Sequence, residues 1–322
     1  MESILITGGA GFIGSNLAEA LLSMGHRITV IDDLSTGKME NIEALQGSGR
    51  MSFFKGSILD AGLLRSVIEQ NGVTLISHQA AIPSVAKSVA NPARSMEANV
   101  VGTATVFDVA ARLGCKRIVF ASSSSVYGDT PELPKRESMP LNPKSPYAAS
   151  KAAKEMLAKV FSGLYGMEIV GLRYFNVYGR RQDPASEYAA VVPKFVTRAL
   201  ANEPITIDGD GLQTRDFTYI DDVIQANVRA LTGQDVQTGV FNIAFGDRIS
   251  VMDLARMILK VTGSKSEIIH NPPRPGDVRD SLADIGDARR ALGYAPEFDL
   301  AAGLEKTISY FSSGEKSRDK LN

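Results

Sequence analysis

The sequence predicts an α/β fold: a doubly wound, mostly parallel sheet covered by helices on both faces, followed by a smaller C-terminal α/β lobe. Two observations support this prediction. Short apolar runs alternate with helical patterns through the first half of the 322 residues, and such alternation is typical of parallel strands joined by helices. Hydrophobic residues make up 44 % of the chain, which is enough to form a sizeable core at this length.

The strands expected in the first half are short and apolar, and most are followed by a helical pattern. In Phe12–Met24, for example, apolar residues recur on one helical face. We expect strands at Ser3–Thr7, Arg27–Asp32, Met51–Lys55, Val73–His78, Arg117–Ser122 and Glu168–Arg173, and further helices at Ala61–Glu69, Ser95–Arg112 and Tyr147–Tyr165.

From about Gly179 the pattern loosens, and loops rich in Gly, Asp and Pro separate the elements. We therefore expect a sheet domain over residues 1–178, to which later segments can return, a lobe over 179–312 and a polar tail over 313–322. The elements predicted for the lobe are strands at Ile205–Ile207 and Gly239–Ala244 and helices at Ala189–Ala201, Asp221–Thr232 and Val251–Thr262.

Composition excludes several classes of partner. The net charge is −1 with acidic and basic residues interspersed, which argues against nucleic acid and anionic membranes and favours a small molecule. His26, His78 and His270 lie far apart in the sequence, so we predict no metal site. Cys115 has no second cysteine to pair with, and no long apolar segment opens the chain, so we expect a cytoplasmic location.

A glycine-rich turn, Thr7–Gly14, follows the first strand and opens the first helix. This Rossmann-like arrangement lets the backbone approach a pyrophosphate and directs a helix N-terminus at its charge. Asp32, at the end of the second strand, would accept hydrogen bonds from ribose hydroxyls and repel a 2′-phosphate, so NAD is favoured, with FAD and NADP as formal alternatives. The predicted cofactor contacts here are Gly8, Gly11, Phe12, Ile13, Gly14, Asp32 and Asp33.

Tyr147 and Lys151 lie four residues apart, on one face of the helix predicted after a proline-rich loop. A neighbouring ammonium and the positive nicotinamide ring would lower the pKa of the phenol, which could then take a proton from a substrate hydroxyl. Such pairs also arise by chance on surface helices. Ser122–Ser125 follows a strand at the edge where ligands of this fold bind, and a serine there could hold the substrate hydroxyl near the tyrosine.

Taken together, these motifs resemble the extended short-chain dehydrogenase/reductases of the NAD-dependent epimerase/dehydratase family, over roughly residues 1–310. His78-Gln79-Ala80-Ala81 and Val126-Tyr127-Gly128 also match. Within that family, Leu172–Gly179, Arg215-Asp216-Phe217 and Arg274–Asp277 look like the nucleotide-sugar 4-epimerases. The resemblance implies an NAD-binding domain over 1–178, a nucleotide-sugar-binding lobe over 179–312 and a UDP-sugar substrate.

The resemblance also assigns roles to single residues. Ser123 and Tyr147 would form the catalytic pair, while Lys151 would hold the nicotinamide ribose and lower the tyrosine pKa. Further cofactor contacts would be Ser57, Ile58, Gln79, Ala80, Ala81, Asn99, Ser122, Tyr147, Lys151 and Tyr174. Substrate contacts would be Ser84, Ser123, Ser124, Tyr147, Asn176, Val191, Arg215, Arg274, Asp277 and Ser281, with the two arginines on the diphosphate.

Two departures from family patterns bear on the reaction. Ser57 stands where the family usually has an aspartate that reads adenine, which would weaken adenine recognition without excluding NAD. Serines also stand before Val126, where related dehydratases and decarboxylases carry an acid. This favours oxidation at C4, rotation of the keto sugar and return of the hydride, with NAD retained. A nucleotide-sugar dehydratase, a reductase using exchanging NADPH and a non-catalytic NAD-binding regulator are the alternatives.

Substrate identity depends on a residue shortly after the Arg-Pro-Gly-Asp segment, which in the family limits the space beside the C2 substituent. Here it is Ser281, and a small residue admits an N-acetyl group. Arg180–Pro184 and Tyr188–Val191 are also similar to the subgroup that prefers N-acetylated substrates. We therefore predict a UDP-N-acetylglucosamine 4-epimerase, with a UDP-glucose 4-epimerase as the alternative. By resemblance only, helices Ser95–Arg112 and Tyr147–Tyr165 would form a homodimer interface.

Overall fold

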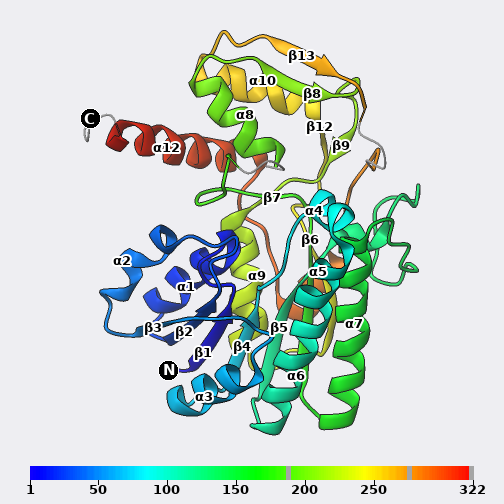
Figure 1. The fold of residues 1–322 in the computed structure, drawn as a ribbon. Coiled ribbons are helices and arrows are strands. Elements are labelled where there is room, and N and C mark those ends of the chain that lie inside the picture. The colour runs from blue at the N-terminus through cyan, green and yellow to red at the C-terminus, as the bar shows by residue number, and fades with distance from the viewer. Residues whose placement is uncertain (186–189, 274–277, 319–322) are drawn as a thin grey trace.

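The protein is described by a computed structural model, which covers residues 1–185, 190–273 and 278–318. A seven-stranded parallel sheet forms its centre, in the order β11-β6-β5-β4-β1-β2-β3 (Figure 1). Its strands are β1 (Ser3–Thr7), β2 (Arg27–Asp32), β3 (Met51–Lys55), β4 (Leu75–His78), β5 (Arg117–Ser123), β6 (Glu168–Tyr174) and β11 (Gly239–Ile243). The predicted doubly wound α/β fold is confirmed.

Alternation along the strands explains why helices cover both faces of the sheet. Ile4 and Ile6 of β1 belong to one hydrophobic cluster, whereas Leu5 between them belongs to the other, as the two-residue period of a strand requires. On the first face, α1 (Phe12–Ser23) packs beside α9 (Ile220–Thr232). On the second face lie α3 (Ala61–Asn71), α6 (Gly102–Arg112) and α7 (Pro146–Tyr165).

The helix predicted over Ser95–Arg112 is not continuous. It consists of α5 (Pro92–Met96), a π-helical turn η2 (Glu97–Val101) and α6. The wider turn directs Asn99 into the interior, where its side chain is fully buried and donates to Ser150 Oγ at 3.0 Å. A buried amide needs such partners, and hydrophobic periodicity gives no signal for a π turn.

A strand and a helix from the second half complete the central sheet. We expected Gly239–Ala244 and Asp221–Thr232 within the stretch assigned to the lobe, but β11 pairs in parallel with β6, and α9 contacts α1, β4 and β5. This corrects their placement, although the domain prediction left room for segments to return. The physical reason is that β6 would otherwise be an exposed edge and that the apolar face of α1 needs a second helix.

The lobe is built from short strands and three mutually packed helices. The helices are α8 (Val191–Leu200), α10 (Val251–Thr262) and α12 (Leu300–Arg318). Its paired strands are β8 (Ile205–Asp208) with β13 (Ile268–Asn271), β9 (Thr214–Arg215) with β12 (Ile249–Ser250), and β7 (Val177–Tyr178) with β10 (Thr218–Tyr219). The remaining elements are η1 (Met39–Asn41), η3 (Ser124–Tyr127), α2 (Glu43–Gln46), α4 (Val85–Ala90) and α11 (Gly286–Leu292).

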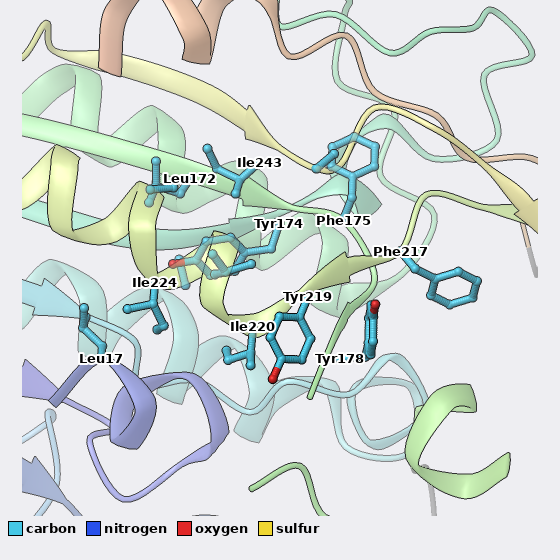
Figure 2. Close-up of a cluster of buried hydrophobic side chains, with 14 of the residues drawn as sticks. Leu17, Leu172, Tyr174, Phe175, Tyr178, Phe217, Tyr219, Ile220, Ile224 and Ile243 are labelled. Carbon is cyan, nitrogen blue, oxygen red and sulfur yellow. The ribbon is translucent and has the colours of Figure 1, made fainter. Parts of the chain in front are cut away.

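One apolar cluster runs without interruption from the sheet into the lobe. Figure 2 shows Leu17 of α1 and Leu172 of β6 in the same layer as Tyr178 and Phe217 at the base of the lobe. This shared core fixes the lobe relative to the strand ends. Helix α12, anchored by Leu304 and Ile308, continues to Arg318 and so extends into the stretch predicted as a polar tail.

Candidate active site

A cleft of about 1640 Å³ lies between the carboxyl ends of the sheet strands and the lobe. The strand order reverses between β1 and β4, and in doubly wound sheets ligands bind at such a switch point. The cleft is lined by residues from the end of β1 (Gly8), of β2 (Asp32), of β4 (Gln79), of β5 (Ser123) and of β6 (Tyr174). Segments far apart in the sequence therefore meet at one edge of the sheet.

The glycine-rich turn has the shape that a dinucleotide requires. Gly8 has φ +71°, and a Cβ there would lie 2.7 Å from the backbone of Ala80, so only glycine fits without displacing the neighbouring loop. A Cβ on Gly14 would collide with the carbonyl oxygen of Gly8. The turn therefore presents bare backbone at the start of α1, where Gly11, Phe12, Ile13 and Gly14 line the cleft, and this fits a pyrophosphate.

Asp32 and Asp33 both line the cleft beyond this turn. Asp32 Oδ2 accepts from the amide of Ala10 at 3.0 Å and Oδ1 from that of Leu34 at 2.8 Å. Burial raises the pKa of the Asp32 carboxyl, and these two amide bonds partly offset that rise. A carboxylate has about four acceptor positions, so Asp32 keeps capacity for ribose hydroxyls while it holds the turn in place. Ser57 and Ile58 line the same end.

The loop after β4 is held from behind by buried polar side chains. Gln79, Ala80 and Ala81 line the cleft as predicted. Asn99 does not line the cleft. Its Oδ1 accepts from the amide of Ile82 at 2.8 Å, so it supports the loop from behind.

The predicted catalytic residues come together in the cleft. Ser123 ends β5, and Tyr147 and Lys151 project from the first turns of α7, which packs on β5. The ammonium of Lys151 lies 5.5 Å from the centroid of the Tyr147 ring and donates to the carbonyl oxygen of Ala121 at 2.9 Å. These contacts place a phenol, a hydroxyl and an amine around one point at the sheet edge.

The pKa values of these groups differ from the simple expectation. Burial raises the pKa of Tyr147, and a hydrogen bond with Ser123 partly opposes that rise. This direction is opposite to the lowering by Lys151 that the Tyr147/Lys151 spacing predicts. Burial lowers the pKa of Lys151 itself to about 8, while Glu155 acts in the opposite direction. The protein alone therefore does not favour the Tyr147 phenolate. The positive charge of the nicotinamide ring would have to lower the pKa of Tyr147.

Five further predicted substrate residues, from both the sheet domain and the lobe, line the cleft: Ser84, Ser124, Asn176, Arg215 and Ser281. Val191 does not: it packs on the hydrophobic cluster at the start of α8, and its neighbour Ala190 lines the cleft instead. Arg274, Asp277 and Tyr188 lie outside the described residues.

Among the cleft residues to which the sequence predicts no role, three polar side chains stand out. Lys135 lies in the cleft wall with only 3 % of its surface exposed and donates to the carbonyl oxygen of Thr130. Gln182 also lines the cleft, and its buried Oε1 has no hydrogen-bond partner among the described residues. Lys38 faces them from the other wall. Lys135 and Lys38 are on loops, where neither periodicity nor a short motif marks a contact, whereas Gln182 belongs to the Arg180–Pro184 motif.

Two further searches covered the described part of the chain. Within residues 1–185, 190–273 and 278–318, no helix is long and apolar enough to cross a membrane. In the same ranges, no group of three or more His, Cys, Asp or Glu side chains is arranged to hold a metal ion.

Comparisons with known proteins agree with this site. Residues 4–244 match the model of the NAD dependent epimerase/dehydratase family. A UDP-glucose 4-epimerase of Mycolicibacterium smegmatis is 41 % identical over 309 residues, which are 95 % of this chain and 97 % of that protein. Among solved structures, the UDP-glucose 4-epimerase of Thermotoga maritima with UDP-glucose has a TM-score of 0.92 and 37 % identity, covering 97 % of this chain and 99 % of its own.

A second solved structure has the same degree of likeness. The UDP-N-acetylglucosamine 4-epimerase of Methanobrevibacter ruminantium, in complex with UDP-N-acetylmuramic acid, has a TM-score of 0.92 and 37 % identity, with coverage of 97 % and 99 %. The resemblance inferred from the motifs is thus confirmed at the level of the family, and so is NAD as the cofactor. This chain is an NAD-dependent enzyme and belongs to the NAD-dependent epimerase/dehydratase family.

Proposed function

We propose that the enzyme is a UDP-sugar 4-epimerase that interconverts UDP-N-acetylglucosamine and UDP-N-acetylgalactosamine. The observation that carries this proposal is the meeting of Ser123, Tyr147 and Lys151 at the sheet edge of a cleft that also holds the proposed diphosphate residue Arg215. The alternative is a UDP-glucose 4-epimerase without activity on N-acetylated sugars. The two solved relatives are equally similar to this chain, so the choice rests on the cleft itself.

In the proposed reaction, Tyr147 takes the proton of the C4 hydroxyl, and Ser123 holds that hydroxyl in place. Bound NAD would supply the hydride acceptor and, after the keto sugar has rotated in the site, the hydride donor. Lys151 lies 5.5 Å from the centroid of the Tyr147 ring, and the positive nicotinamide ring of the bound cofactor would favour the phenolate. On return of the hydride to the other face, Tyr147 gives the proton back to the C4 oxygen.

Serines beside the catalytic residues support epimerisation over dehydration. Ser124 and Ser125 line the cleft directly after Ser123, at the position where dehydration would require an acid to expel the leaving hydroxyl. A hydroxyl of ordinary acidity does not perform that step. Oxidation and reduction at C4 need only the tyrosine base and the cofactor.

The small side chain of Ser281 supports an N-acetylated substrate. Ser281 lines the cleft, and its backbone amide donates to the carbonyl oxygen of Thr214 at 3.1 Å, so its position is fixed beside the lobe strands. Arg215, which follows Thr214 in β9, also lines the cleft. A serine at this position leaves space that a bulky side chain would fill.

We further propose that two copies pair through α6 and α7. An apolar stripe follows α7 at helical spacing: Met156 is 61 % exposed, Val160 53 % and Leu164 72 %. Val101, 54 % exposed, lies on η2, which contacts α7, and α6 and α7 run side by side (Figure 1). A contiguous exposed apolar face of this kind marks an interaction surface.

We also propose a cytoplasmic location, since the one cysteine, Cys115, is buried and has no second cysteine to pair with.

The test is to incubate the purified protein, without added cofactor, separately with UDP-N-acetylglucosamine and UDP-glucose and to analyse the products by NMR. We expect the C4 epimer of the first sugar to form, which requires both the reaction and a retained NAD. Conversion of UDP-glucose alone would establish the alternative. If neither sugar changes after NAD is supplied, the epimerase proposal fails for these substrates, and NADPH-dependent reduction becomes the next assay.

A further inference from the structure

Ion pairs join the two walls of the cleft at the end formed by the cofactor domain. Residues 180–183, which we call the strap, follow β7 and pass beside α1. Arg181 and Asp183 line the cleft from the strap, and Phe12 and Lys38 line it from the other wall. Lys38 Nζ lies 3.3 Å from Asp183 Oδ2. Lys38 also donates its backbone amide to the carbonyl oxygen of Ala10 in the glycine-rich turn at 3.0 Å, so this bridge is anchored to the cofactor wall.

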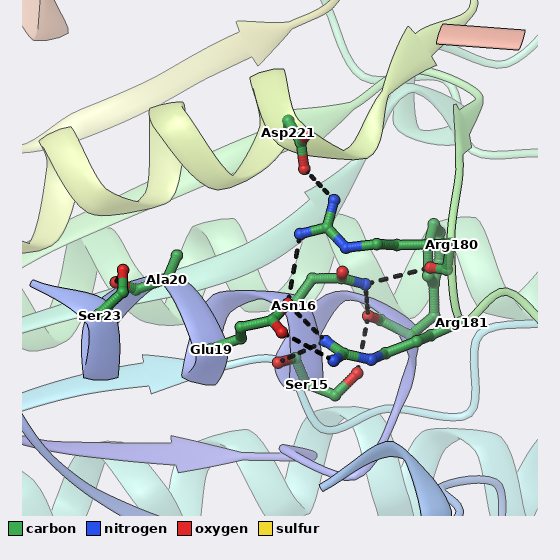
Figure 3. A network of polar contacts seen from close by, with 9 residues as sticks. Ser15, Asn16, Glu19, Ala20, Ser23, Arg180, Arg181 and Asp221 are labelled. Atoms are coloured by element: carbon green, nitrogen blue, oxygen red, sulfur yellow. Dashed lines mark hydrogen bonds and ion pairs between the residues drawn. The ribbon is translucent and has the colours of Figure 1, made fainter. Parts of the chain in front are cut away.

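Glu19 of α1 receives both arginines of the strap (Figure 3). Arg181 donates to Glu19 through two nitrogens, at 3.0 and 3.1 Å, the forked geometry that makes such pairs strong. Arg180 Nη2 lies 3.5 Å from Glu19 Oε2, and its other nitrogen pairs with Asp221 of α9. The strap is thus bound to both helices that cover this face of the sheet.

Two further hydrogen bonds, one of them to its backbone, hold the strap to α1. Asn16, fully buried in α1, donates to the carbonyl oxygen of Arg180 at 3.2 Å, and Arg181 Nη1 donates to the carbonyl oxygen of Ser15 at 3.3 Å. Arg181 has φ 65°, a left-handed conformation that costs a non-glycine residue about 1 kcal/mol or more. The surrounding contacts offset that cost.

We propose that the strap retains the cofactor: the contacts of Glu19 with Arg181 and of Lys38 with Asp183 hold the cleft closed over the adenosine half of NAD and slow its release. This inference rests on the proposed placement of NAD along Gly8–Gly14 and Asp32. A dinucleotide in that place lies between the wall that carries Lys38 and the wall that carries Asp183. Opening the walls to release it separates oppositely charged groups. Slow release suits an enzyme that regenerates its NAD in every cycle, because an enzyme molecule that has lost its NAD cannot react.

The experiment measures release of NAD from the purified holoenzyme, by following the NAD that appears in filtrates after dilution into cofactor-free buffer. The variants are Glu19→Gln, Asp183→Asn and the two combined. Glu69→Gln is the control for the loss of an ion-pairing glutamate elsewhere, because Glu69 Oε1 lies 3.7 Å from Arg65 Nη1 on α3 and Glu69 does not line the cleft. We expect release of NAD to be about five- to thirty-fold faster in the combined variant, which corresponds to the interaction free energy of two or three ion-pair contacts. Release from Glu69→Gln should be unchanged.

Salt gives an independent readout that does not depend on any variant. Raising the salt concentration to about 1 M shortens the screening length to about 3 Å, so it should speed release from the unaltered enzyme and have less effect on the combined variant. Release of NAD at the same rate from all variants and at all salt concentrations would overturn the proposal that the strap retains the cofactor.

Asp32→Ala separates the two proposals. If Asp32→Ala loses NAD readily while the strap variants retain it as the unaltered enzyme does, the cofactor site stands and the strap fails. If Asp32→Ala retains NAD unchanged, the proposed cofactor site is itself wrong. Thermal unfolding of each variant checks that it is folded, and Asp183→Asn, at a partly exposed loop residue, tests the strap even if Glu19→Gln is unstable.

Discussion

Ser122 Oγ donates a hydrogen bond of 2.5 Å to Glu155 Oε1, which ties the end of β5 to the helix that carries Tyr147 and Lys151. Glu155 also receives Arg173 of β6 at 2.7 and 2.9 Å, and both side chains are almost fully buried. One buried carboxylate therefore connects two neighbouring strands with the catalytic helix.

Removing one partner of this ion pair should destabilise the protein strongly. Arg173→Met leaves the Glu155 charge buried without its guanidinium, and we expect the free energy of unfolding to fall by about 3–5 kcal/mol. Denaturant unfolding measures it. The combined variant Arg173→Met, Glu155→Leu should recover part of the loss, and a combined loss equal to the sum of the single losses would show that the charges do not act as a pair.

Tyr147→Phe should abolish turnover and leave NAD bound. Phenylalanine keeps the ring beside Lys151 but has no proton to exchange with the C4 hydroxyl, so we expect the rate to fall by about 10²–10⁴-fold or more. Epimer formation followed by NMR and NAD content after gel filtration provide the two readouts. Substantial residual activity would exclude Tyr147 as the base.

Ser281→Tyr should lower the rate on UDP-N-acetylglucosamine much more than the rate on UDP-glucose. The larger side chain would occupy the space beside the C2 substituent, and discrimination by pocket volume is typically about 10–200-fold. The ratio of kcat/KM for the two sugars is the measurement, with Ser281→Ala as the control that keeps the space open. An equal loss on both sugars would remove Ser281 as the determinant of specificity.

Asp216 should make stability depend on pH. Burial raises its carboxyl pKa to about 7, against the amides of Ala283, Gly246 and Phe245 that stabilise the carboxylate. The unfolded chain releases this proton near pH 4 and the folded protein near pH 7, so between these values the folded state binds more protons. The stability of the native protein relative to Asp216→Asn should therefore fall as pH rises from 4 to 7, by at most about 1.4 kcal/mol per unit, and be constant above. Denaturant titrations across this range measure the difference, and a difference that rises with pH would contradict the assignment.

Leu164→Lys should separate the proposed dimer. Leu164 is the most exposed member of the apolar stripe on α7, and a charge there would have to be desolvated when two copies pair. Sedimentation analysis should show a shift toward monomer. The control is Met24→Lys, which alters a residue 56 % exposed that caps α1 on the opposite face of the sheet. A monomer already present in the unaltered enzyme would refute the interface.

Much of the central sheet was predictable because its signals are local. β1, β2 and β3 have the predicted bounds, since their apolar runs stop at turn residues. The glycine-rich turn, Asp32, Ser123, Tyr147 and Lys151 follow from short motifs beside those strands. Asn99 and Val191 do not line the cleft, because packing against other segments decides where a π turn forms and which side chains at the start of a helix face a cavity.

The sequence by itself determined the class of sheet, the glycine-rich turn and the spacing of Tyr147 and Lys151, because each depends on residues only a few positions apart. Tertiary structure decided that β11 completes the sheet, that Lys135 and Gln182 face the cleft, and that Glu19 meets Arg181 across 162 positions of chain. These contacts depend on how separate segments share one core. Burial, which raises the pKa of Tyr147 and lowers that of Lys151, is likewise a property of the packed molecule and not of any short stretch of it.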